Sequence, residues 1–481
     1  MNKIITLSVL AFFTTTVYAS DDSVKTELDA LKTQLQVQDA KIAKLEKKQK
    51  HNTKKISHVN ELANNDNLKF KADLRTAYDY ISYKTANGKT SSNGVFSNRL
   101  WLNMAYAPTN HLSFYGTLSY YKLYGQTIGA NQGFNYNDAY VNESANPSDE
   151  LRVKEAFWLY KNDTFLGLDV PWTASIGRRP STDGLLVNYR EDQRAKSAIG
   201  HDINIEFDGA SFLYQLENVT NVPGMSLKFC LGRGMSNAYS RASNVSTKDG
   251  KTYTFDPTKK DYSKVDGFDN TDLYGVLFKP YDDGQYSLHT VWFKAFNLPG
   301  MVKTSTPNEY NFKQTGDVEG GAASFVADGI GDGISDMLDD SVVFASFAYS
   351  RTHPGSTGML GKKDSKTGTS VYLGANWPCQ LIDNARVGIE YNHGSKYWRS
   401  FTYGEDTLAG SKLAVRGDAY EAFFNKELIG HKLTAQIRYT YMDYRFTGSN
   451  AFFGDAGKPH DVTGNDIDIA QDIRAYIRYR Y

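Results

Sequence analysis

Two periodicities divide the chain. From residue 68 to the C-terminus, apolar and polar positions alternate with a period of two, and residues 24–63 repeat with a period of 3.5. At the start of the alternating region, Leu74 and Tyr78 fall on one face, and Asp73 and Arg75 fall on the other. A strand that is apolar outward and charged inward is typical of a transmembrane β-barrel wall.

The last strand shows the same alternation more clearly. Apolar side chains at every second position alternate there with Arg474, Arg478 and Arg480. A soluble β-sandwich would also alternate, but it would rarely cover three arginines of its last strand. The residues predicted to face the lumen are therefore Asp73, Arg75, Arg474, Arg478 and Arg480.

Fifteen alternating segments are found between residue 68 and the C-terminus. The segments are 68–80, 96–107, 111–123, 151–161, 172–179, 201–218, 225–234, 270–280, 284–296, 341–351, 369–376, 386–398, 414–426, 431–446 and 467–481. If both ends of this region lie in the periplasm, the strand number is even. The missing strand is expected within 297–340, best placed at 320–328, which gives an all-β barrel of about sixteen antiparallel strands.

Short polar turns alternate with long polar connections, as in outer-membrane barrels. The long connections are expected at one end of the barrel. The third of them, residues 180–200, mixes acidic and basic side chains. If it folds inward, facing charges would select small polar solutes; a solvated loop explains the same composition equally well. The candidate constriction residues are Arg178, Arg179, Asp183, Arg190, Glu191, Asp192, Arg194 and Lys196.

A second charged segment, 317–340, contains seven acidic residues and no basic one. It lacks the spacing of a calcium loop. We expect a solvated outside loop or a short plug helix there, and no metal site.

The period of 3.5 predicts an α-helical coiled coil in front of the barrel. Its predicted oligomer seam is Leu28, Leu31, Leu35, Ile42, Leu45, Ile56 and Val59. A lone amphipathic helix is the alternative. The pattern does not separate a dimer from a trimer, and we favour the trimer. Residues 20–67 are thus read as a periplasmic stalk and its joint to the barrel.

The first 19 residues have the features of an export signal. Lys3 precedes an apolar run that ends at Phe13, and Val17 and Ala19 are the small residues of a cleavage site. The apolar run is shorter than the roughly 20 residues that span a bilayer. We expect a cleaved signal peptide at 1–19 rather than an anchor, followed by the stalk at 20–67 and the barrel at 68–481.

Composition agrees with a barrel and argues against other classes. Aromatic residues make up 14% of the chain, and 54 basic residues balance 54 acidic ones, so no nucleic-acid partner is expected. Catalytic and zinc-binding motifs are not found; we therefore expect no enzyme activity, cofactor or metal. Two cysteines, Cys230 and Cys379, could form one bridge, but two free thiols are the simpler reading.

Several short sequence segments resemble those of a known family, and the resemblance extends from the stalk to the last strand. They include 98–104, 153–156, 171–182, 206–210 and 231–234. On these segments the chain resembles an uncharacterised family (a domain of unknown function) of porin-like outer-membrane proteins from epsilon-class proteobacteria. The resemblance implies an outer-membrane barrel and adds no substrate. The aromatic C-terminal Tyr481 is similar to the C-terminal residue of outer-membrane barrels, where Phe is usual.

Two functions are compatible with this sequence. The first is a porin-type channel for passive diffusion of ions and small hydrophilic solutes, embedded in outer-membrane lipid as a homotrimer with a periplasmic stalk. The second is a plugged barrel that serves as a surface-binding or envelope-tethering protein. The transported solute, the pore size and the sign of ion selectivity are left open.

Overall fold

The computed structural model describes residues 68–124, 151–179, 183–196, 198–248, 252–306, 309–330, 333–402, 405, 407–449 and 453–481. The predicted signal peptide and the stalk with its seam residues lie outside the described residues. Residues 68–481 form one compact unit, which is considered by itself below.

Within the described residues, sixteen long strands form one closed antiparallel sheet. Each strand pairs with its neighbours in chain order, and β1 pairs with β19 to close the barrel. Their bounds are β1 Lys69–Thr85, β2 Thr90–Tyr106, β3 Leu112–Leu123, β4 Leu151–Asn162, β5 Trp172–Arg179, β6 Phe207–Gln215, β7 Ser226–Met235, β10 Thr271–Asp282, β11 Tyr286–Lys303, β12 Tyr310–Asp328, β13 Val342–Pro354, β14 Thr367–Pro378, β15 Ala385–Gly394, β16 Gly417–Ile429, β17 Leu433–Tyr444 and β19 Ile467–Arg480. The prediction of about sixteen strands is confirmed.

Smaller elements lie in the connections between these strands. They are the 3-10 turns η2 (Val187–Tyr189) and η3 (Lys412–Ala414), the one-turn helices α2 (Glu217–Thr220) and α3 (Asp336–Asp339), the hairpin β8 (Val245–Lys248) and β9 (Thr252–Phe255), and the short β18 (Phe453–Gly454). Among the described residues, no helix is long and apolar enough to cross a bilayer.

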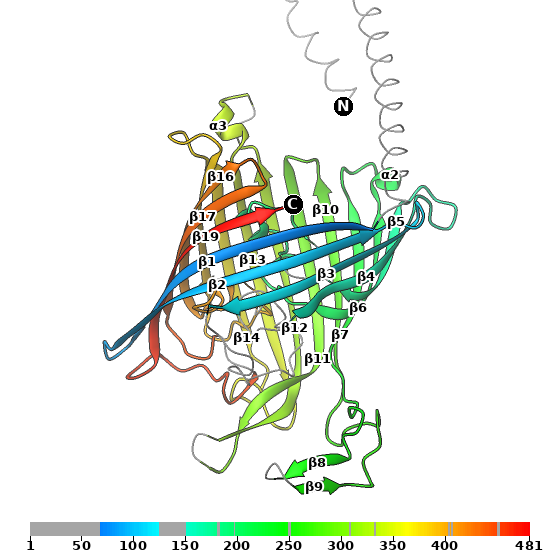
Figure 1. Ribbon diagram of the computed structural model, residues 1–481, viewed down its shortest axis with the longest axis vertical. Coiled ribbons are helices and arrows are strands. Elements are labelled where there is room, and N and C mark those ends of the chain that lie inside the picture. The colour runs from blue at the N-terminus through cyan, green and yellow to red at the C-terminus, as the bar shows by residue number, and fades with distance from the viewer. Residues whose placement is uncertain are drawn as a thin grey trace, which may run out of the picture. The chain divides into compact units, whose positions relative to one another are not determined.

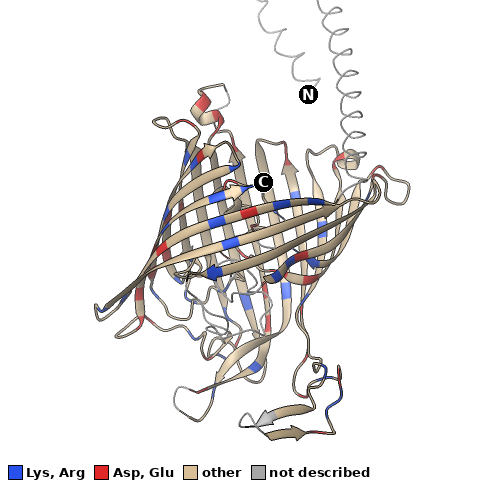
Figure 2. Cartoon of the chain, viewed as in Figure 1, with Lys and Arg blue, Asp and Glu red and all other residues tan. Residues whose placement is uncertain are grey.

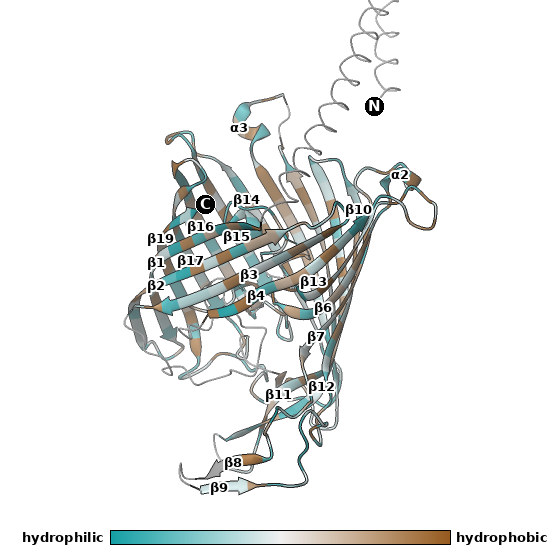
Figure 3. Ribbon diagram, turned by 45° about the vertical axis from the view of Figure 1, so that its right-hand side comes forward, coloured by the Kyte–Doolittle hydropathy of each residue, from teal (hydrophilic) through white to brown (hydrophobic). Residues whose placement is uncertain are grey.

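Alternation along each strand separates the two faces of the wall. On β19, Ile473 and Ile477 are about half exposed, whereas Arg474 and Arg478 are buried. On this strand the charged positions therefore face inward and the apolar positions outward, as the period of two predicts. Figure 3 shows hydrophobic positions recurring along the strands.

The barrel has two unlike ends. β1 begins and β19 ends at one of them, here called the terminal end; the other is the loop end. Because neighbouring strands are antiparallel, connections alternate between the ends. The turns at 283–285 and 430–432 lie at the terminal end, with α2 and α3 (Figure 1). The long connections at 180–206, 236–270, 395–416 and 445–466 lie at the loop end.

The missing strand is β12, and it includes the predicted segment 320–328. It pairs with β11 and β13 along most of its length. The predicted segment 201–218 was too long, because β6 begins only at Phe207. Residues 201–206 instead belong to the connection after β5, where the backbone N–H of Asn204 donates to the carbonyl of Phe401 at 2.7 Å. The predicted segment 386–398 likewise extends past the end of β15.

The acidic segment 317–340 was placed wrongly. Its first part is strand: Asp317 and Glu319 flank the fully buried Val318 on β12. Its second part contains α3, where Ser335 caps the backbone N–H of Leu338 at 3.3 Å. This helix lies at the terminal end and not in an outside loop. The strand at 320–328 was predicted, but the acidic composition favoured a loop for Asp317 and Glu319, which the structure places in the same strand.

Candidate functional site

The inner wall carries a cluster of arginines. Arg75 lies opposite Arg99 on β2 and opposite Arg478 on β19, and Arg438 lies opposite Arg474. All five are buried. Like charges side by side on one sheet face are destabilising unless counter-charges are present. Figure 2 shows acidic and basic positions interspersed along the strands of this wall.

Acidic residues on the same wall balance part of this charge. The Arg478 guanidinium lies 2.5 Å from a carboxylate oxygen of Asp73, and Arg474 is hydrogen-bonded to Asp79. The Arg99 guanidinium stacks over the Trp101 ring with 3.6 Å to its centroid. Charge-assisted bonds and stacking of this kind are what hold guanidinium groups inside proteins.

The third long connection folds into the barrel. Leu186, Val187 and Ile199 are buried, and the backbone N–H groups of Leu185 and Gly200 donate to the carbonyls of Ala198 and Leu185, each at 2.9 Å. We call residues 183–206 the third loop. Its two arms therefore pair with each other, and the loop has an apolar core of its own.

Asn188 shapes the turn at the tip of the third loop. Its side-chain oxygen accepts from the backbone N–H of Leu186 at 3.0 Å, and its amide nitrogen donates to the carbonyl of Gln193 at 3.0 Å. Asn side chains commonly bridge backbone groups in this way. The η2 turn that results presents Arg190 and Glu191 to the opposite wall.

Arg190 joins the third loop to acidic residues from two other parts of the chain. Its Nη1 lies 3.1 Å from Glu405 Oε1 and 3.4 Å from Glu421 Oε1 on β16. Burial alone would lower the pKa of Arg190, but Glu421, Glu405 and Glu191 together raise this pKa well above its usual value. Arg190 is therefore charged at any physiological pH.

Glu191 lies within the arginine cluster of the wall. Its carboxylate is 3.2 Å from Arg438 Nη1 and 3.6 Å from Arg478 Nη1, and it accepts from the Tyr476 hydroxyl at 3.0 Å. Arg190 and Glu191 are adjacent at the loop tip, and they bind wall residues of opposite charge: Arg190 binds a glutamate, and Glu191 binds arginines. A buried charge is tolerated only when oppositely charged and hydrogen-bonding groups surround it.

Backbone carbonyls of the tip are also bound by the wall. The Arg190 carbonyl accepts from Asn425 Nδ2 at 3.1 Å and from Gln436 Nε2 at 2.7 Å. The Asp192 carbonyl accepts from Arg480 Nη1 at 3.3 Å. The loop leaves the wall after β5 and returns at β6, so contacts with β16, β17 and β19 mean that it crosses the lumen.

A second inward segment, 395–416, completes the network. Trp398 is fully buried, and its indole N–H donates to the carbonyl of Leu413 at 2.7 Å. Lys412 contacts Glu390 and Glu421. Glu421 therefore binds a cation from each inward segment, Arg190 and Lys412, and links them to the wall.

The base of the third loop holds two unusual buried groups. His201 hydrogen-bonds to Ser346 and Ser370 on the wall, each at 2.9 Å, and burial lowers the pKa of His201 to about 3. His201 is thus neutral and donates one bond while accepting the other. Next to it, both carboxylate oxygens of Asp202 are buried without a hydrogen-bond partner, and burial raises the pKa of Asp202 well above its usual value.

The remaining predicted constriction residues do not gather at the tip. Arg178 lies 3.6 Å from Asp208, and Lys196 pairs with Glu155 on β4. Asp183 is buried, its backbone N–H donating to the Asn204 side chain at 3.0 Å. Arg194 is exposed, and Asp192 lies near Glu427 and His431.

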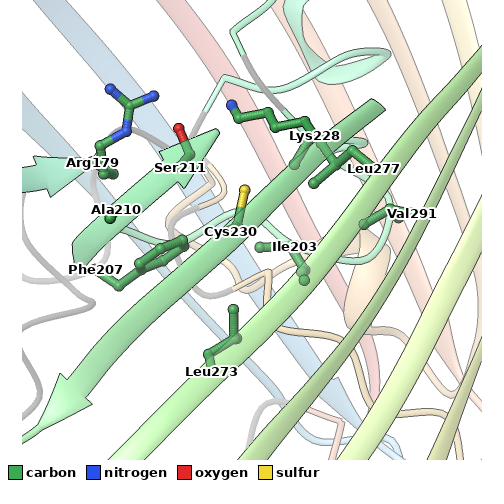
Figure 4. Close-up of a pocket in the computed structure, with 12 residues that line it drawn as sticks. Arg179, Ile203, Phe207, Ala210, Ser211, Lys228, Cys230, Leu273, Leu277 and Val291 are labelled. Atoms are coloured by element: carbon green, nitrogen blue, oxygen red, sulfur yellow. The ribbon is translucent and has the colours of Figure 1, made fainter. Parts of the chain in front are cut away.

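Arg179 faces a small cavity between the third loop and the wall. Its guanidinium lies 4.1 Å from the centroid of the Phe157 ring. Figure 4 shows Arg179, Lys228 and Cys230 around this cavity, whose volume is about 20 Å³. That volume holds about one water molecule, so we assign no ligand to it. Cys230 and Cys379 are both free thiols.

Sequence reasoning missed the wall residues that bind the tip. Glu421 and Arg438 lie at inward positions of β16 and β17, and the alternation of these strands could have identified them. Lys412 and Glu405 lie in an irregular segment, and periodicity gives no information on such residues.

Comparisons with solved structures return outer-membrane proteins of low identity. OmpT of Vibrio cholerae in its trimer form is 11% identical over 86% of this chain and 99% of that chain, with a TM-score of 0.45. OmpF of Salmonella typhi in complex with daunomycin is 10% identical over 87% and 99%, with a TM-score of 0.46. OprB of Pseudomonas putida at high pH is 11% identical over 86% and 94%, with a TM-score of 0.48. Likenesses of this level carry no argument about function, and the barrel is established by its own strand pairing.

No curated protein matches the chain. A family model does: the model described as a protein of unknown function (DUF3373) matches residues 89–481. The match does not show the expected epsilon-proteobacterial origin. It extends from β2 to the C-terminus and includes the third loop and its wall contacts. The chain therefore belongs to this family of unknown function, and its barrel is a closed one of sixteen strands.

Proposed function

We propose that the protein is an outer-membrane porin-type channel through which ions and small hydrophilic solutes diffuse passively. One observation carries the proposal. A charged loop crosses the inside of a closed sixteen-stranded barrel, and its tip binds the opposite wall through Arg190 and Glu191. The loop is placed so that it narrows the lumen.

The outer surface of the barrel supports a membrane location. Large apolar side chains project outward along every part of the wall, for example Phe347, Ile437 and Ile473. Because β1 pairs with β19, the sheet has no open edge. A closed barrel that satisfies its backbone internally and is apolar outside can span a lipid bilayer.

Charge inside the barrel supports permeation of small polar solutes. The wall supplies Arg75, Arg99 and Arg478, and the inward segments supply Glu191 and Glu405. Rings of fixed charge around a narrow passage select ions by sign and size. Since basic groups dominate the wall next to β1, we infer a preference for anions.

We further propose that the barrel works as a homotrimer in outer-membrane lipid, with residues 20–67 as a periplasmic stalk. The support is the heptad pattern of the stalk, because coiled coils assemble two or more helices. The apolar outer wall offers surface for contact with neighbouring copies as well as with lipid.

Ionic current through a planar bilayer tests the proposed channel. The refolded full chain should give stepwise current increases, in groups of three if the protein is a trimer. With a salt gradient, the reversal potential should show a preference for anions. A protein that inserts into the bilayer and never conducts would overturn the proposal.

The second candidate is a plugged barrel that acts as a surface-binding or envelope-tethering protein. The observation that favours it is the burial of both inward segments, including Trp398, Arg399 and Lys412. Removing residues 21–63 separates the two candidates. A channel should still conduct ions without the stalk. A tether should lose its attachment to periplasmic partners.

A further inference from the structure

Three potential metal ligands meet at the terminal end of the barrel. Asp192 lies at the tip of the third loop, Glu427 near the end of β16, and His431 in the turn between β16 and β17. One ligand atom from each residue lies within 4.8 Å of the other two. Two parts of the chain that are distant in sequence, the tip of the third loop and the end of β16 with its turn, thus bring one imidazole and two carboxylates together.

The backbone around these residues fixes their positions. The Asp192 carbonyl is held by Arg480 and its N–H by the carbonyl of Tyr189 at 3.3 Å. The N–H of Glu427 donates to the carbonyl of Asn384 at 2.9 Å. His431 Nδ1 lies 2.6 Å from Glu427 Oε1. The ligands are therefore close to a chelating arrangement before any ion arrives.

We propose that Asp192, Glu427 and His431 bind a divalent cation of the zinc class. One imidazole nitrogen with two carboxylate oxygens suits Zn²⁺, whereas Ca²⁺ and Mg²⁺ prefer oxygen ligands alone. Three protein ligands leave a fourth tetrahedral position for water. The two carboxylates neutralise the charge of the ion, and the nearby guanidinium of Arg480 opposes binding.

The ion would join the third loop to the barrel wall at the terminal end. Asp192 belongs to the loop, while Glu427 and His431 belong to the wall and its turn. An ion bound by all three crosslinks the two parts and stabilises the loop in its inward position. The side chain of His431 is 83% exposed, so an ion can enter from solvent at the terminal end. This site is independent of whether the barrel conducts.

Zinc titration of the refolded full chain, by calorimetry in detergent, tests the site. We expect one Zn²⁺ per chain and an increase in the thermal unfolding midpoint when zinc is added. His431→Ala should weaken binding at least tenfold and abolish the increase. The exposed position of His431 leaves the fold of this variant intact. Asp192→Asn should weaken binding similarly, because only the loop supplies that carboxylate.

His460→Ala is the matched control. His460 also pairs with one carboxylate, with 3.0 Å between Nε2 and Asp466, but within the described residues it belongs to no three-ligand group. Its removal should leave zinc binding unchanged. Absence of stoichiometric binding, or binding that is insensitive to His431→Ala and Asp192→Asn, would overturn the proposal. Loss of the site in His460→Ala would place it elsewhere and also overturn the proposal.

Discussion

Single residues inside this barrel are stabilised by completed charge pairs. Glu191 has Arg438, Arg478 and Tyr476 around it, and Arg190 has Glu405 and Glu421. Removing one member of a buried pair leaves an uncompensated charge, which typically costs about 3–5 kcal/mol. The tip of the third loop should therefore be sensitive to single substitutions that leave its shape unchanged.

Glu191→Gln removes the negative charge at the loop tip and keeps its size. Arg438 and Arg478 then each lose one counter-charge, while Glu421 and Asp73 remain near them. The net charge at the tip becomes more positive, so the reversal potential in a salt gradient should shift toward anions. The matched control is Asp461→Asn, the same charge change at a side chain that is 77% exposed, and it should have no effect. An unchanged reversal potential in Glu191→Gln would show that the tip does not border the ion path.

Asp202→Asn tests the buried carboxyl without a partner. Because burial raises the pKa of Asp202, the folded protein keeps a proton that the unfolded chain releases above about pH 4. Wild-type stability therefore falls as pH rises from there to the raised pKa, by about 1.4 kcal/mol per pH unit. The variant should unfold at higher urea than wild type at neutral pH, and this advantage should vanish in acid.

The exposed Asp163 supplies the control for this comparison. Asp163→Asn should show no such pH-dependent gain. If Asp202→Asn were less stable than wild type at neutral pH, the carboxylate would have a partner that the packing does not show.

At the scale of elements, strand alternation predicted the wall well because each strand has one lipid-facing and one inward face. The prediction failed where segments leave the wall. The strand pattern continues in sequence through residues 201–206 and 395–398. In the structure these residues have left the wall, and the side chains of His201 and Trp398 form hydrogen bonds inside the barrel. Local periodicity cannot distinguish an inward strand face from an inward loop, since both bury alternate side chains.

Trp398→Ala tests the packing of the segment 395–416. The fully buried ring packs next to Gly394, where an added Cβ would lie 2.8 Å from Trp398 Cδ1. Losing the ring should cost about 3–5 kcal/mol and expose 395–416 to protease. Tyr253→Ala, on the exposed hairpin β8–β9, is the control and should leave this segment protected. Equal protease resistance in both variants would contradict the packing described here.

At the scale of the whole molecule, the outward apolar wall is the feature on which the proposed membrane location rests. Ile473→Arg places a charge on that wall and should lower the stability of the barrel in lipid vesicles by about 2–4 kcal/mol if the position lies at mid-membrane. Leu381→Arg, in a turn where the side chain is 93% exposed, should have little effect. Folding of both variants with equal stability would contradict the membrane assignment.

The candidate site was only partly predictable because its two halves lie far apart in sequence. The sequence of the third loop was sufficient to predict that Arg190 and Glu191 are candidate charged residues of the site. Their partners Glu405, Glu421 and Arg438 become neighbours only when the barrel closes and the loop crosses it. No spacing rule relates a loop tip to the wall that it will contact, so the structure was needed to pair them.

The central claim is that the third loop controls the passage through the barrel. Single-channel conductance of the full chain, compared with a variant in which a short Gly-Ser linker replaces residues 183–196, tests it most directly. We predict small conductance steps for the full chain and steps several-fold larger for the variant, because the variant lacks the segment that crosses the lumen. Equal conductance in the two proteins, or none in either, would contradict this account.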